Sequence, residues 1–134
     1  MADKVLVRQN DKFEISFQAA DPQEPNGELE PIAHLYALTP HGMLLASLAA
    51  CTTILLHSYA QHHNIDLPWV EIEAIYQHPS DEEFESEQEQ IVKTLMLPDD
   101  LDDAMRERLH KISHRCSIQE VLENGISIQS RLGS

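Results

Sequence analysis

Two cysteines are the residues of this chain that are best suited to covalent chemistry. Cys51 lies within a long apolar segment, and Cys116 lies between Arg115 and Ser117 near the carboxyl end. A thiolate can be oxidised to a sulfenic acid, and a second thiol keeps this oxidation reversible by condensing with the sulfenic acid to a disulfide. The two cysteines are far apart in the sequence, so only the fold can bring their sulfurs together.

Each cysteine also has a plain structural explanation. Free cysteine is among the most buried residue types and often packs as a small hydrophobe, which fits Cys51. That residue also lies too deep inside its predicted helix to be activated by the helix dipole. Cys116 directly precedes Ser117, the predicted N-cap of a short helix, where free N–H groups and Arg115 would favour its thiolate. Otherwise Cys116 is an exposed linker residue.

A histidine pair offers a second kind of chemistry. His110 and His114 are four positions apart on a predicted helix, a spacing at which two imidazoles can ligate one metal ion. Two histidines and the nearby Cys116 do not form a usual zinc set, so we predict no metal site and keep a metal-binding protein as the weakest alternative. We find no Gly-rich phosphate loop, no Ser-His-Asp order and no paired-carboxylate motif.

The amino-acid composition limits the classes of protein to which this chain can belong. The chain has 23 acidic and nine basic residues and a formal net charge of −14, whereas binding to nucleic acid or to anionic membranes requires a basic surface. With 134 residues, 42% of them hydrophobic, we expect one folded domain over residues 1–134. We find no signal-peptide pattern, and two cysteines are too few for a disulfide scaffold, so we expect a cytoplasmic protein with reduced thiols.

The element that must position Cys51 is a helix from Pro40 to about His62. Thr39 is a typical N-cap, and proline suits the first helical position, where its missing N–H costs nothing. Every residue in Met43–Leu56 is apolar or small, so this helix must be covered on nearly all sides. The apolar run is shorter than the roughly 20 residues of a membrane span, so we predict a core helix.

Alternating apolar and polar residues predict the strands. We expect a hairpin around Asn10-Asp11, formed by Lys4–Gln9 and by a second strand with Phe13, Ile15 and Phe17 on one face. Further strands are predicted at Trp69–Gln77, Ile91–Leu97 and Ile126–Leu132. The remaining segments are an exposed loop at Asp21–Pro31, a short strand or extended lead at Ile32–Leu38, and a solvated hairpin connection or strand end at Ser80–Gln90.

Two shorter helices are predicted before the last strand. The first, from Asp99 onward, has an apolar stripe of Leu101, Met105, Leu109 and Ile112. The second starts at a capping box, Ser117 to Glu120, and ends at Asn124-Gly125. The predicted fold class is therefore α+β, with the element order β-β-(β)-α-β-β-α-α-β.

Three stretches together resemble the OsmC/Ohr family, named for osmotically inducible protein C and organic hydroperoxide resistance protein. They are TPHGMLLASLAACTT around Cys51, HRCSIQEVL around Cys116, and the closing GISIQSRL. Members of that family carry a proline-led apolar helix with an Ala-Ala/Gly-Ala-Cys core, and a second cysteine, commonly in a Cys-Pro-Val context, before a short helix and a last strand. The resemblance covers most of Pro40–Leu132 and includes the order of the elements.

The resemblance implies a fold, an assembly and an activity. Family members form intertwined homodimers in which two central helices are enclosed by two sheets, which would explain a helix without a polar face. Cys51 matches the peroxidatic cysteine, which reduces organic hydroperoxides and becomes a sulfenic acid. Cys116 matches the resolving cysteine, which forms a Cys51–Cys116 disulfide that an external dithiol reduces. The resemblance implies no cofactor.

This chain departs from the family pattern near the peroxidatic cysteine. Family peroxidases use an arginine to stabilise the thiolate and a preceding glutamate to orient that arginine. Here His41 and Gly42 occupy the corresponding positions, and residues 27–39 contain no arginine or lysine. Arg8 and His41 are the candidate activating groups that remain, with His34 also near the helix entrance. Without a nearby cation, burial should raise the pKa of Cys51. The alternative function is therefore a non-catalytic OsmC-like protein that binds a small hydrophobic ligand near Cys51.

Overall fold

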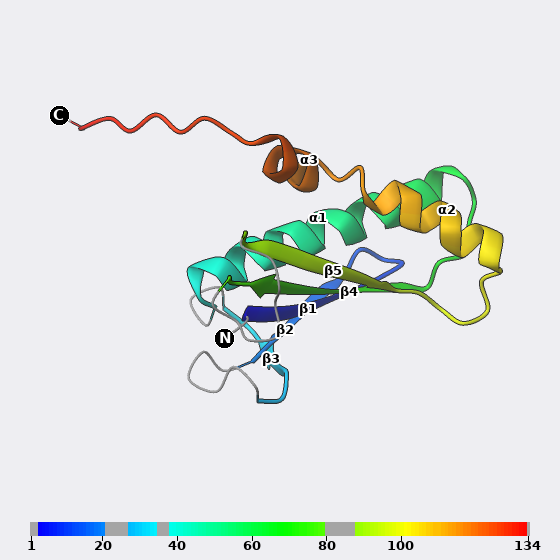
Figure 1. Cartoon of the computed structure of the whole chain (residues 1–134). Coiled ribbons are helices and arrows are strands. Elements are labelled where there is room, and N and C mark those ends of the chain that lie inside the picture. The colour runs from blue at the N-terminus through cyan, green and yellow to red at the C-terminus, as the bar shows by residue number, and fades with distance from the viewer. Residues whose placement is uncertain (1–2, 21–26, 35–37, 80–87, 134) are drawn as a thin grey trace.

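The computed structural model describes residues 3–20, 27–34, 38–79 and 88–133. One antiparallel five-stranded sheet, with the strand order β3-β2-β1-β4-β5, lies under the long helix α1, and two short helices follow the last strand (Figure 1). The elements are β1 (Asp3–Asn10), β2 (Ile15–Ala19), β3 (Glu30–Ile32), α1 (Pro40–His62), β4 (Trp69–Gln77), β5 (Gln90–Met96), α2 (Asp103–Ser113) and α3 (Ser117–Asn124). The predicted α+β class is confirmed.

The centre of the sheet is the antiparallel pair of β1 and β4. Val7 lies opposite Ile72 in this pair, and both are fully buried beneath α1. The alternate residues form the other face, where Arg8 pairs with Glu71 at 2.7 Å. The alternation predicted for Trp69–Gln77 is thus confirmed, because the apolar residues of β4 face the helix and the polar residues face away.

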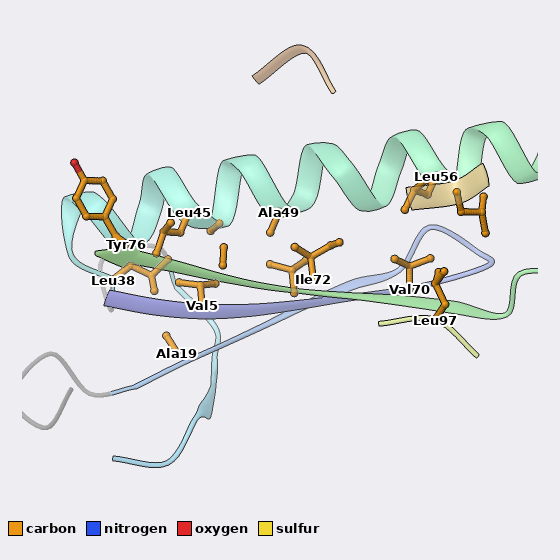
Figure 2. Packing of buried hydrophobic residues seen from close by; sticks show 14 of the residues in the cluster. Val5, Ala19, Leu38, Leu45, Ala49, Leu56, Val70, Ile72, Tyr76 and Leu97 are labelled. Carbon is orange, nitrogen blue, oxygen red and sulfur yellow. The ribbon is translucent and has the colours of Figure 1, made fainter. Parts of the chain in front are cut away.

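Helix α1 begins and ends as the sequence predicts. The Thr39 hydroxyl accepts the Gly42 N–H at 2.9 Å and donates to the Asp3 carboxylate at 3.0 Å, which ties the helix start to β1. Leu45, Ala49 and Leu56 point from α1 toward the sheet (Figure 2). By length and composition α1 alone satisfies the criteria for a membrane span among the described residues, but half of its apolar window is buried inside the chain. The packing of α1 against the sheet is typical of a core helix.

The first hairpin is confirmed, with a wider turn than predicted. The Asn10 side-chain oxygen accepts the N–H groups of Lys12 and Glu14, both at 3.0 Å, and Phe13 has a φ of 64°. The second strand therefore starts at Ile15 and not at Phe13. An asparagine side chain that bonds to the following backbone favours such a turn.

Strand β3 corrects the predicted loop at Asp21–Pro31. Glu30 and Pro31 pair with β2 at the edge of the sheet, where a proline is tolerated because its missing N–H faces away from the ladder. Residues 21–26, 35–37 and 80–87 of the predicted loops and leads lie outside the described residues. Strands β4 and β5 are antiparallel neighbours, and Gln90 is the first residue of β5.

Helix α2 starts later than its apolar stripe. Asp102 is the N-cap and accepts the Met105 N–H at 2.7 Å, so Leu101 precedes the helix. Met105, Leu109 and Ile112 still pack toward the core, as the stripe predicts.

The predicted last strand, Ile126–Leu132, is not formed within this chain. Gly125, with a φ of 83°, ends α3, and the following tail runs away from the rest of the molecule (Figure 1). Ile128 in this tail is 85% exposed. A strand is defined by hydrogen bonds to a neighbour, and among the described strands none pairs with the tail. The tail keeps the alternating sequence of a strand but pairs with none of the strands that the structure describes in its own chain.

The packing of the sheet against α1 makes a stability prediction. We expect Ile72→Ala to lower the free energy of unfolding by about 2–5 kcal/mol, because it removes a fully buried side chain and leaves a cavity. Glu73→Ala, on the opposite face of the same strand, should cost less than about 1 kcal/mol, since it removes only a surface ion pair. Urea denaturation at one fixed protein concentration measures both, and equal losses would contradict the assigned register.

Candidate functional site

The N-terminal end of α3 lies against α1 and brings the two cysteines together. Cys51 is partly exposed on α1, and its sulfur lies 3.6 Å from the Ser117 hydroxyl oxygen at the start of α3. Cys116, directly before that helix, is only 1% exposed. Cys116 is therefore a buried residue next to Cys51, and not the exposed linker residue that the sequence left open.

Cys116 itself caps α3, one residue earlier than the predicted N-cap Ser117. Its sulfur accepts the Gln119 N–H at 3.3 Å and lies 3.6 Å from the Thr52 hydroxyl of α1. A sulfur in this position takes the place of the side-chain oxygen that usually satisfies a free N–H group of the first helical turn. Capping and docking of α3 thus depend on the same atom.

The pKa of Cys51 is lowered, contrary to the expectation from its burial. Burial raises it, but hydrogen bonds from the Ile118 N–H, the Ser117 hydroxyl, the Cys116 thiol and the Ser117 N–H outweigh that effect. These donors are the free groups at the N-terminus of α3, where a negative charge is favoured. The helix that activates Cys51 is therefore α3 and not its own helix.

Lys93 on β5 is a cation close to this site, and the sequence analysis did not single it out. Its ammonium donates to the Thr52 hydroxyl oxygen at 3.1 Å, the Ser113 carbonyl oxygen at 2.8 Å and the Gln119 side-chain oxygen at 2.5 Å. Burial lowers the pKa of Lys93, and the charges of Cys116, Cys51 and Glu123 oppose that shift. The strand period was the available signal, because a lysine between Ile91 and Leu95 on the apolar face must point inward.

The structure does not bring the two predicted activating groups to Cys51 within one chain. Arg8 pairs with Glu71 and lies 4.8 Å over the Trp69 ring, on the sheet face opposite α1. His41 is at the first turn of α1, about 15 Å along the helix axis from Cys51, and its ring contacts Tyr76 with a centroid distance of 4.5 Å. Their predicted role thus depends on a second chain.

His41 belongs to a separate polar cluster at that end of α1. The Tyr76 hydroxyl donates to the Glu89 carboxylate at 2.7 Å, and this bond, together with burial and the Glu89 charge, raises the pKa of Tyr76 to about 12. The same bond lowers the pKa of Glu89. Tyr76 is therefore a hydrogen-bond donor at neutral pH and not a base.

The histidine pair lies close together on α2. The Nε2 atoms of His110 and His114 are 3.4 Å apart, a separation that two ligands of one metal ion can adopt. Among the described residues, no group of three or more His, Cys, Asp or Glu side chains is arranged to hold a metal ion. The pair alone is an incomplete ligand set.

A cavity of about 700 Å³ is lined by residues of α1, β5, α2 and α3, and neither cysteine lines it. Its walls combine apolar residues with Lys93 and Gln119, which also belong to the thiol site. The apolar residues are Leu44, Leu48, Ile91, Leu95 and Leu122. Its size and mixed lining suit a small organic molecule.

The comparisons with known proteins agree with this arrangement. The family model described as OsmC-like protein matches residues 33–131, which include both cysteines and Lys93. The chain belongs to the OsmC-like family. No curated protein matches the chain in sequence. The fold is similar to that of an OsmC-like hydroperoxide resistance protein from Jannaschia sp. CCS1, with a TM-score of 0.59, 12% identity, and coverage of 99% of this chain and 94% of that chain. The predicted OsmC/Ohr-like fold is confirmed.

The two thiols should differ in reactivity in this OsmC-like protein. We expect iodoacetamide at pH 7 to alkylate Cys51 at least about tenfold faster than Cys116, because Cys51 is more exposed and its thiolate is favoured. The pH midpoint for Cys51 alkylation should lie below that of an unperturbed cysteine. Peptide mass spectrometry over a pH series measures both rates, and preferential labelling of Cys116 would contradict the site.

Proposed function

We propose that this OsmC-like protein is a thiol peroxidase that reduces organic hydroperoxides, with Cys51 as nucleophile and Cys116 as resolving thiol. The observation that carries the proposal is the position of the Cys51 sulfur. It is accessible, next to a second thiol, and hydrogen-bonded by the first residues of α3, which lower its pKa. An accessible, stabilised thiolate with a resolving thiol beside it suits reversible oxidation.

The proposed reaction has three steps. The Cys51 thiolate attacks one oxygen of the O–O bond, an S–O bond forms, and the alkoxide takes a proton and leaves as the alcohol. The Cys116 sulfur then attacks the Cys51 sulfenic acid, an S–S bond forms, and the hydroxyl leaves as water with the thiol proton. An external dithiol reduces this disulfide by exchange and is itself oxidised to a disulfide. The sequence of steps uses no resident cofactor.

The substrate class follows from the cavity. Its apolar wall would hold the organic part of a hydroperoxide, and Lys93 and Gln119, which line the cavity, also lie in the hydrogen-bond network around Cys116. The similar structure from Jannaschia sp. CCS1 is described as a hydroperoxide resistance protein. The same cavity favours the second candidate function, which is binding of a small hydrophobic ligand without turnover. The need for a dithiol reductant favours a cytoplasmic location, where thiols are kept reduced.

The peroxidase proposal predicts the behaviour of two variants. Wild-type protein should consume cumene hydroperoxide in the presence of dithiothreitol, and Cys51→Ser should abolish this. Cys116→Ser should still react once and accumulate a sulfenic acid, which dimedone labels and mass spectrometry detects. Absence of turnover in the wild type and of dimedone labelling in Cys116→Ser, together with a small apolar molecule found by native mass spectrometry, would support the ligand-binding alternative instead.

We also propose that the protein is an intertwined homodimer. Within one chain α1 keeps exposed apolar residues, with Met43 at 39% and Ile54 at 46% exposure. The tail after Gly125 presents Ile126 and Ile128 without a partner. A second copy covers both features at once, because each tail gains a strand neighbour and each central helix gains a cover.

The dimer proposal predicts an effect of a charge in the tail. In analytical ultracentrifugation the wild type should have twice the 15.2 kDa mass of the chain. Ile128→Asp should shift it toward monomer, because a carboxylate cannot be buried cheaply in an apolar contact. The neighbouring Gln129→Asp adds the same charge on the opposite side of an extended segment and should remain dimeric. A monomeric wild type would refute this assembly.

A further inference from the structure

Among the described residues, no carboxylate lies in direct contact with the half-buried ammonium of Lys93. Its three hydrogen-bond acceptors are the Thr52 hydroxyl, the Ser113 carbonyl and the Gln119 amide oxygen, all neutral. Among the described residues, none of the ion pairs includes Lys93. A charge removed from water is costly unless an opposite charge compensates it. Lys93 therefore needs an anion that its direct contacts do not supply.

The two side chains that Lys93 holds are the ones that surround Cys116. The Thr52 hydroxyl oxygen lies 3.6 Å from the Cys116 sulfur, and the backbone N–H of Gln119 donates to that sulfur at 3.3 Å. The charges of Cys116 and Cys51 both act on Lys93, so the ammonium lies within electrostatic range of the two sulfurs.

We propose that Lys93 is the counter-ion of the thiol pair, a positioning residue that Thr52 and Gln119 hold beside Cys116 and that stabilises whichever of the two sulfurs carries negative charge. In its place on β5 it supplies the cation that the OsmC/Ohr resemblance led us to expect from an arginine. For turnover this inference rests on the proposed peroxidase function, but its electrostatic part concerns the reduced protein alone.

The position suits both steps of the proposed reaction. In the reduced protein the first residues of α3 favour the Cys51 thiolate, and its charge is one of those that act on Lys93. After Cys51 becomes a neutral sulfenic acid, the next nucleophile is Cys116, and the same ammonium lies beyond Thr52 from its sulfur. One cation can stabilise both nucleophiles in turn, because the negative charge passes from one sulfur to the other while the ammonium of Lys93 stays in place.

Other titratable and charged groups line the two cavities that Lys93 borders. Glu123 lies on α3, Glu89 lies before β5, Tyr76 lies on β4, and Asp103, Arg106, Glu107, His110 and His114 lie on α2. Of these, Glu123 is the one whose charge acts on Lys93, in addition to the two sulfurs. The test therefore compares variants that share all of these groups and differ only at position 93.

The experiment compares full-length Lys93→Met, Lys93→Gln and Lys93→Arg with the wild type, all reduced. Iodoacetamide alkylation of Cys51 is measured over a pH series by mass spectrometry. Loss of the ammonium should raise the alkylation midpoint by about one pH unit in both neutral variants and slow alkylation at pH 7 about tenfold. Arginine keeps the charge, so Lys93→Arg should stay within about threefold of the wild-type rate.

Lys111→Met, which removes an exposed lysine of α2, is the matched control and should leave the midpoint unchanged. Lys93→Gln keeps a hydrogen-bonding side chain, so it serves where Lys93→Met fails to fold. A wild-type midpoint in the folded Gln variant, or a shift in Lys93→Arg as large as in the neutral variants, would overturn the proposal. No hydroperoxide is used, so these outcomes are independent of whether the wild type turns over peroxide.

Discussion

The docking of the N-terminal end of α3 onto α1 is the contact on which the site depends. Without it Cys51 would be a thiol on an apolar helix, with no donor from its own backbone, since the N–H groups around it are used within α1. With it, free N–H groups of another helix point at the sulfur, and the effect of burial on its pKa is reversed. The sulfur of Cys116 caps the docking helix, so one thiol positions the donors of the other.

Burial and function are divided between the faces of α1. One face packs Leu45, Ala49 and Leu56 on the sheet and fixes the helix in place. Thr52, buried beside the sheet, reaches both Lys93 and Cys116. A single helix without charged residues thus serves as a core element and as the platform for the thiols, and only its polar threonine connects the two roles.

Capping residues and the alternation of apolar and polar residues predicted the elements whose formation depends on residues close together in the sequence. Thr39 and Pro40 predicted the start of α1. The alternation of apolar and polar residues predicted a strand at Trp69–Gln77, and β4 has the same first and last residues. The cysteine pair was predicted by resemblance, and its placement follows from the fold. The alternation of β5 places Lys93 on the apolar face, but its contacts with Thr52 and Gln119 depend on how β5, α1 and α3 pack, which the sequence pattern does not give. The last strand was expected from alternation, yet a strand needs a neighbour, and none of the described strands of this chain pairs with it.

The order of the elements along the chain has a consequence for synthesis. The sheet strands and α1 all precede Ser113, whereas every group that stabilises the Cys51 thiolate from α3 follows it. Because a chain is synthesised from its amino end, Cys51 is made before the residues that donate hydrogen bonds to its sulfur. The environment that lowers the pKa of Cys51 is therefore complete only when the carboxyl-terminal part of the chain has been added.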